Sequence, residues 1–163
     1  LLFETSGMTD QSASNQEGVS LKKFTGQGLI RVGNTATGGR NCMEFFNGNG
    51  QVGTIATSSS ATAYNTSSDY RLKENVTELT GATERLKQLK PSQFNFIADA
   101  DTTVDGFLAH EVSSIVPEAI TGTKDAVDDD GNPVYQGIDQ SKLVPLLVAT
   151  IKELEARIAT LEG

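Results

Sequence analysis

The sequence has few of the residues on which a large core, a disulfide framework or a histidine-based active site would depend. Its 163 residues include one cysteine, one histidine and no tryptophan, and aromatic residues make up only 6%. The single cysteine, Cys42, excludes a disulfide within the chain, and we expect it to be a buried small residue rather than a reactive thiol. Because large apolar residues are scarce, oligomerisation is the favoured source of the missing buried surface.

Long apolar runs are also absent. No stretch is long enough to span a membrane and no signal peptide is recognisable, so membrane insertion is not expected. The sequence begins at Leu1 without a methionine, and we interpret it as a fragment of a longer chain.

Charge divides the sequence into two parts. The formal net charge is −8, but residues 1–67 are neutral and all the excess negative charge follows them. The neutral part holds four basic and four acidic residues: Lys22, Lys23, Arg31, Arg40, Glu4, Asp10, Glu17 and Glu44. Nucleic acid is excluded as a partner, because phosphate binding needs a face of lysine and arginine.

The neutral part is typical of a β-stranded fibre. Ten of the 16 glycines precede Ser68, residues 1–20 are predicted to form a polar linker, and residues 57–68 an extended hydrated segment. Short strands are predicted at 29–32, 42–46 and 52–55, with Asn47-Gly48-Asn49-Gly50 as the turn between the last two. Strands this short and glycine-rich do not make a stable monomeric sheet, which favours an intertwined fibre.

The acidic part mixes helices and strands. A helix is predicted over 80–90, with Thr80 as N-cap and Pro91 as its end. Strands are predicted at 94–97 and 106–112, the latter alternatively running into a short helix that ends near Pro117. A polar turn at 128–133 and a return strand at 134–138 follow. The acidic run in that turn lacks calcium-loop spacing, so we interpret it as a turn, and no metal or cofactor is expected.

The C-terminal segment has the clearest periodicity. Apolar residues follow a 3,4 spacing over about three heptads, which predicts a helix at 144–162 that packs as a coiled coil. These residues are Val144, Leu147, Ile151, Leu154, Ile158 and Leu161. A helix this short needs partners, since isolated helices of 12–15 residues barely form in water. The alternative is an amphipathic helix packed within a monomer.

The junction between the two parts carries a serine and a lysine five residues apart, Ser68 and Lys73. A neutral lysine amine can remove the proton of a serine hydroxyl and make it a nucleophile, provided that burial or a nearby cation such as Arg71 favours the neutral form. Attack on the carbonyl of Ser67 closes a five-membered ring, which predicts a cut between Ser67 and Ser68 in a single-turnover reaction of the chain on itself. On spacing alone, a polar turn is the simpler interpretation. The only histidine, His110, is interpreted as structural.

The junction resembles the start of the intramolecular chaperone auto-processing domain of phage tail fibres and tailspikes, including endosialidase tailspikes. The residues that carry this resemblance are Thr66-Ser67-Ser68-Asp69-Tyr70-Arg71-Leu72-Lys73-Glu74-Asn75-Val76. A related domain occurs in myelin regulatory factor. The resemblance continues through Leu89-Lys90-Pro91, Phe94-Asn95-Phe96, Gly106-Phe107-Leu108-Ala109-His110-Glu111-Val112 and Val116-Pro117-Glu118-Ala119. It closes with Ile138-Asp139, Leu143-Val144-Pro145-Leu146-Leu147 and the terminal helix.

The resemblance implies an α+β homotrimer in which residues 1–67 are the distal end of a β-rich fibre and residues 68–163 a chaperone domain that ends in a bundle of helices. Such a domain aligns the fibre chains, after which Ser68 as nucleophile and Lys73 as base release it; Asp69, Arg71 and Asn75 complete the motif.

The implied partners are two further copies of the chain and, through the mature fibre, a host-cell receptor. The implied location is the virion tail fibre, assembled in the host cytoplasm. The alternative function is a clamp or receptor-binding tip that is never cleaved. A serine hydrolase with external substrates has no pocket signature to support it.

Overall fold

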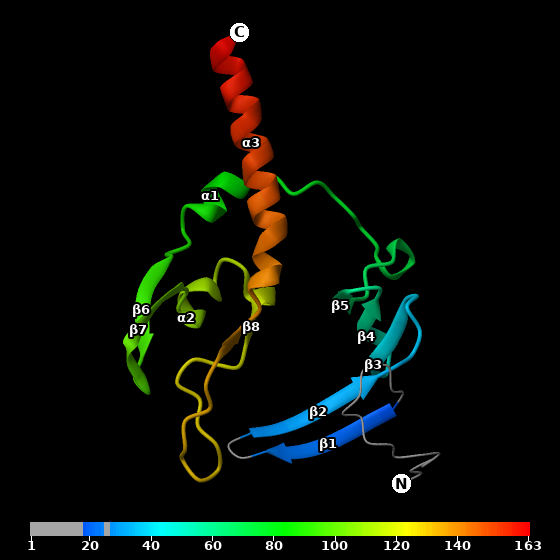
Figure 1. The fold of residues 1–163 in the computed structure, drawn as a ribbon. Helices are drawn as coiled ribbons and strands as arrows, with labels where there is room; N and C mark the ends of the chain where they lie inside the picture. Colours follow the sequence, from blue (N-terminus) through cyan, green and yellow to red (C-terminus); the bar gives the residue numbers. More distant parts are fainter. Residues whose placement is uncertain (1–17, 25–26) are drawn as a thin grey trace. The chain divides into compact units, whose positions relative to one another are not determined.

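The computed structural model describes residues 18–24 and 27–163, which contain both sheets and helices and give an α+β fold. The chain divides into two compact units, residues 1–75 and 76–163 (Figure 1). Most of the linker predicted at residues 1–20 lies outside the described residues, although its last three positions already belong to the first strand.

The first unit consists of antiparallel strands. A hairpin is formed by β1 (Gly18–Phe24) and β2 (Gln27–Gly33). A three-stranded sheet follows in the order β3 (Arg40–Asn47), β4 (Gly50–Ser58) and β5 (Ala61–Thr66). The strands predicted at 29–32, 42–46 and 52–55 are confirmed, since they lie within β2, β3 and β4.

Two tight turns join the strands of this sheet. The predicted turn after Asn47 is confirmed: Gly50 has a φ of +95°, and the N–H of Asn49 donates to Asn47 Oδ1 at 2.9 Å. The second turn contains Ser59 at a φ of +52°, a conformation that serine rarely adopts. Its N–H donates to the carbonyl of Thr37 at 2.8 Å, which helps to hold it. No glycine or asparagine lies next to Ser59 to signal a turn. The sequence therefore predicted an extended segment over residues 57–68 and not the turn between β4 and β5.

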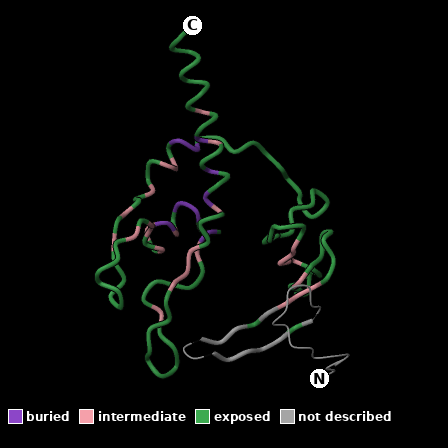
Figure 2. Tube along the Cα trace, viewed as in Figure 1, coloured by how far each residue is buried: buried purple, intermediate pink, exposed green. Residues whose placement is uncertain are grey.

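The sheet of the first unit leaves large apolar side chains exposed. They include Met43, Phe45, Phe46 and Tyr64. Where side-chain burial is described, the fully buried residues all belong to the second unit (Figure 2). The described side chains of the first unit therefore form almost no core in a single copy.

The second unit is built from short elements that end in one long helix. In chain order they are α1 (Ala82–Leu86), β6 (Ser92–Phe96), β7 (Asp99–Gly106), α2 (Ala109–Val112), η2 (Pro117–Ala119), β8 (Ile120–Thr121), β9 (Gly137–Ile138), η3 (Gln140–Leu143) and α3 (Val144–Glu162). The strand predicted at 94–97 overlaps β6, and the turn predicted at 128–133 is confirmed by N–H groups of Asp130 and Asn132 that donate to Asp128.

Of the two alternatives for residues 106–112, the strand running into a short helix is confirmed. Strand β7 ends at Gly106, where a Cβ would lie 3.1 Å from the ring of Phe94, and α2 follows. Two other predicted boundaries in this unit are wrong. The return strand at 134–138 is reduced to the two residues of β9, paired with β8. The helix at 80–90 is reduced to α1, and Thr80 is not its N-cap. Gly81 holds that position at a φ of +66° and offers no side chain.

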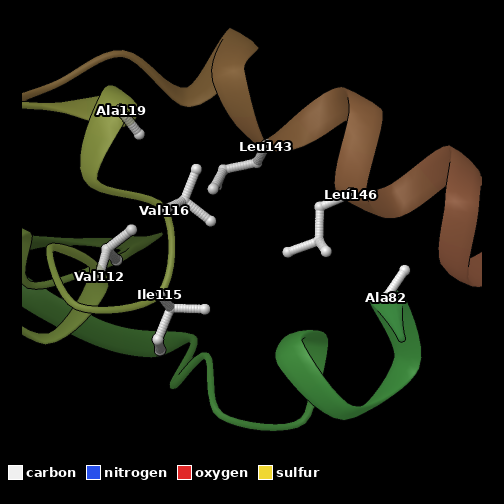
Figure 3. Close-up of a cluster of buried hydrophobic side chains, with 7 residues drawn as sticks. All are labelled: Ala82, Val112, Ile115, Val116, Ala119, Leu143 and Leu146. Atoms are coloured by element: carbon white, nitrogen blue, oxygen red, sulfur yellow. The ribbon is translucent and has the colours of Figure 1, made fainter. Parts of the chain in front are cut away.

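The core of the second unit is one small cluster. Its side chains come from α1, α2, the segment after α2, η2, η3 and α3, and converge on a common centre (Figure 3). The buried members are Ala82, Val112, Ile115, Val116, Ala119, Leu143 and Leu146. Leu86 and Leu89 are partly buried and pack against it.

Helix α3 has one face that packs against the unit and one face that is exposed. One face packs on the unit through Leu146 and Thr150, which are 2% and 1% exposed. The other carries the six heptad residues, all of them exposed, from Leu154 at 41% to Leu161 at 87%. The C-terminal half of α3 extends beyond α1 (Figure 1). The predicted helix is confirmed, and its packing as a coiled coil stays a prediction.

The carboxylate of Glu153 fastens α3 to the start of α1. It accepts hydrogen bonds from the N–H groups of Ala82 and Thr83, each at 2.8 Å, and from the Thr83 hydroxyl. These are N–H groups that the first turn of a helix cannot satisfy internally. The bonds from Thr83, first its hydroxyl and then its N–H, and from Ala82 lower the pKa of Glu153 to about 2. Glu153, 70 residues away in sequence, therefore caps α1 in place of Thr80.

Leu146→Ala should destabilise the second unit strongly, because it removes a fully buried side chain and leaves a cavity. We expect a loss of about 2–4 kcal/mol in the free energy of unfolding, measured by urea denaturation followed by circular dichroism. Ile97→Ala is the matched control, since Ile97 is fully exposed, and should change stability by less than about 0.5 kcal/mol. Equal losses for the two variants would contradict this description of the core.

Glu153 should make stability depend on pH in the acid range. Its pKa is about 2 in the folded chain against an ordinary value of 4.5, so its contribution is complete above pH 4.5 and disappears as the pH falls toward 2. Glu153→Gln should lower the urea midpoint at pH 7 and flatten its decline between pH 4.5 and 2. Glu155→Gln, an exposed change half a helical turn away, should follow the wild type. An unchanged acid profile in Glu153→Gln would contradict the cap.

Candidate functional site

The sheet of the first unit ends at Ser67. Strand β5 stops at Thr66, and the N–H of Ser67 then donates to the carbonyl of Val52 at 3.1 Å. The Ser67 hydroxyl donates to the carbonyl of Gln51 at 3.0 Å. Ser67 is thus held against the first residues of β4 by its main chain and its side chain, and the next peptide bond, to Ser68, is the first beyond the sheet.

A single 3₁₀ turn, η1 (Tyr70–Leu72), follows at once. Asp69 begins the turn, because its Oδ1 accepts from the N–H of Arg71 at 2.8 Å. The N–H of Leu72 donates to the carbonyl of Asp69, and the N–H of Lys73 to that of Tyr70, both at 3.1 Å. Aspartate is a favoured residue for this capping role. The turn folds the chain back so that Lys73 returns toward Ser68.

The structure brings the two predicted catalytic side chains together. Lys73 Nζ donates to Ser68 Oγ at 2.7 Å, and both residues are exposed in the single chain. This is the distance required between a serine nucleophile and its base. With the proton on the amine, the lysine donates to the hydroxyl; a neutral amine in the same place accepts the hydroxyl proton.

Arg71 makes a different contact from the one expected of it. Its Nε donates to Asp69 Oδ1 at 2.9 Å and its terminal NH2 nitrogen to Asp69 Oδ2 at 2.8 Å. The side-chain bonds from Arg71 lower the pKa of Asp69, with a further contribution from the N–H of Arg71, and Asp69 in turn raises the pKa of Arg71. Arg71 is therefore no free cation beside Lys73, because Asp69 offsets its charge.

Asn75 ends the junction with a backbone reversal. Its φ is +52°, in the left-handed region that asparagine tolerates better than other residues with a Cβ. It is also the last residue of the first compact unit. The motif residues thus have different structural roles: Asp69 and Arg71 form the turn, and Asn75 changes the direction of the chain after it.

Other candidate residues take structural positions. Cys42 is half-buried, and its sulfur lies 3.7 Å from both Asn34 Nδ2 and Thr57 Oγ1, so its surroundings are more polar than predicted. His110 lies in α2 with an exposed side chain. Across the described ranges, no group of three or more acidic, histidine or cysteine side chains could hold a metal ion. No helix in the part of the chain that the structure describes is both long and apolar enough to cross a bilayer.

Residues 68–121 match the model of a family described as chaperone of endosialidase. This segment is therefore similar to that chaperone family. The family is named as a peptidase, which agrees with a peptidase chemistry at the serine and lysine. The match begins at Ser68, the residue after the last contact of the sheet, and ends with β8 at Thr121. No curated protein matches the chain.

The match covers the junction and the elements from η1 to β8. Helix α3, its heptad residues and the strands of the first unit lie outside it. Sequence reasoning found Ser68 and Lys73 but not Glu153, whose partners are some 70 residues distant. It also did not find the cap formed by Asp69, although an aspartate two residues before its N–H partner is a recognisable signal.

Asn75→Ala should loosen the junction, because alanine in the left-handed region costs roughly 1–2 kcal/mol. We expect faster limited proteolysis within residues 69–80, mapped by mass spectrometry. Asn75→Gly keeps the conformation accessible and should be cut as slowly as wild type, as should Glu74→Ala next to it. If alanine and glycine behave alike at position 75, the positive φ does not govern this segment.

Proposed function

We propose that this chain is a trimerisation chaperone joined to the end of a fibre, and that it removes itself by cutting the chain between Ser67 and Ser68. The observation that carries the proposal is the 2.7 Å contact of Lys73 Nζ with Ser68 Oγ, at the first residue of the family match. The bond in question lies directly after the last hydrogen bonds of the sheet.

The reaction follows from these positions. Lys73, as the neutral amine, takes the proton of the Ser68 hydroxyl, and Oγ attacks the carbonyl carbon of Ser67. The C–N bond between Ser67 and Ser68 breaks, and the proton passes from Lys73 to the departing amine of Ser68. Ser67 is then joined to Oγ as an ester. Water hydrolyses it, which leaves a carboxylate on Ser67 and restores the Ser68 hydroxyl. Each chain acts once, on a bond held at high effective concentration.

Trimer formation is supported by the free face of α3. Its six heptad residues are exposed in the single chain, and its C-terminal half has no covering partner within the unit. A helix of 19 residues that packs only along its first half gains most of its stability from partners. In our proposal three copies associate along this face and hold three fibre ends in register while their exposed sheets fold together.

The role in a virus follows from the same proposal. The chaperone domain aligns a phage tail fibre or tailspike in the host cytoplasm, is released after cleavage, and leaves a mature fibre that attaches the virion to a host-cell receptor. Removal of the domain prevents the assembled fibre from disassembling by the route through which it formed.

The test is a comparison of intact and cleaved chain. Wild type, after folding, should run on a denaturing gel as pieces of about 67 and 96 residues, the sizes that a cut of the 163-residue chain after Ser67 leaves, whereas Ser68→Ala and Lys73→Ala should stay intact. Hydroxylamine added during folding should leave a hydroxamate on Ser67, because it attacks esters faster than amides. Ser60→Ala, in the turn between β4 and β5, is the matched control and should be cut like wild type. A wild-type chain that assembles and stays intact would instead favour the permanent clamp.

A further inference from the structure

Between Ser68 and Lys73 lie two charged side chains that bind each other, Asp69 and Arg71. We propose that they are positioning residues for the cleavage reaction: Asp69 closes the turn that brings Lys73 to Ser68, and Arg71 offsets the charge that Asp69 would otherwise direct at the lysine amine. This inference rests on the proposed self-cleavage and gives these two residues roles within it.

The first step concerns distance. An extended chain advances about 3.3 Å per residue, so residues five apart would be separated by about 16 Å. The observed separation of Lys73 Nζ and Ser68 Oγ is 2.7 Å, and η1 is the element that folds the chain back. A turn of three residues has little stability of its own. The bond from the N–H of Arg71 to Asp69 Oδ1 at 2.8 Å is its side-chain cap.

The second step concerns charge. A bare carboxylate beside Lys73 would stabilise the protonated amine, which cannot accept the serine proton. Both carboxylate oxygens of Asp69 are instead bound by the guanidinium of Arg71. Glu74 is the remaining charged side chain in residues 67–75, and it is exposed. The arrangement keeps the capping carboxylate while reducing its net field at the amine.

The two roles predict different effects of three substitutions. Asp69→Ala removes the cap and should slow cleavage by at least about tenfold, the scale of misplacing a reacting group. Asp69→Asn keeps an oxygen that can accept from the N–H of Arg71, so its maximal rate should stay close to that of wild type. Arg71→Gln keeps the cap but leaves the carboxylate uncompensated.

The pH dependence of cleavage separates positioning from general destabilisation. Arg71→Gln should move the rate profile to higher pH, because the free carboxylate favours the protonated amine. Asp69→Asn should move it to lower pH, because the cation of Arg71 is then unpaired. Each shift should be about half a pH unit, the effect of one charge a few ångströms away in water. Both shifts should shrink in 1 M salt.

The experiment uses the full chain, unfolded in urea and diluted into buffers from pH 6 to 10. Cleavage is followed on denaturing gels and assembly by light scattering. Asp128→Ala is the matched control: it also removes an aspartate that holds a turn, and it should keep the wild-type rate and profile.

Each outcome decides the inference. Asp69→Ala that assembles and cleaves at the wild-type rate overturns the positioning role. If Asp69→Ala fails to assemble, the other two variants decide: opposite pH shifts support the inference, and equal or absent shifts overturn it. A wild-type chain that is never cut overturns the proposed function and this inference with it, whereas a cleaving wild type with unaffected variants overturns the inference alone.

Discussion

Among the described residues, a single copy of this chain leaves many large apolar side chains exposed, and the rest of the structure depends on that constraint. The fully buried apolar side chains number seven among those described, and they all belong to the second unit. The sheet of the first unit exposes aromatic rings, and α3 exposes a complete heptad face. The second unit has enough of a core to cover one side of α3, and the adjoining heptad side stays exposed in the single chain.

Glu153 links this constraint to the junction. The segment after Asn75 leads directly into α1, and the first N–H groups of α1 are held by a carboxylate on α3. A bond of this kind requires α3 to be helical and docked. The backbone that follows the junction is thus held in place by α3, the helix whose association we propose.

Local chemistry was predictable from the sequence, and long-range partners were not. The strands around Asn47-Gly50 and the terminal helix follow from turn residues and heptad spacing. The contact of Ser68 with Lys73 is consistent with their separation of five residues in the sequence. The cap of α1 was assigned to Thr80 because capping rules consider only nearby residues, whereas Glu153 supplies it from 70 residues away. The turn at Ser59 escaped prediction because its positive φ is imposed by neighbouring strands, not by the residue.

The short distance between Ser68 and Lys73 does not by itself make the serine reactive. Ser68 and Lys73 are already 2.7 Å apart in one chain, yet both are exposed to water. With Arg71 bound to Asp69, burial is the remaining way to favour the neutral amine. In the assembly that we propose, three associated copies would supply that burial, so the pair would be positioned in the single chain and activated only on assembly. Such an order would keep the proposed chaperone attached until the fibre has formed.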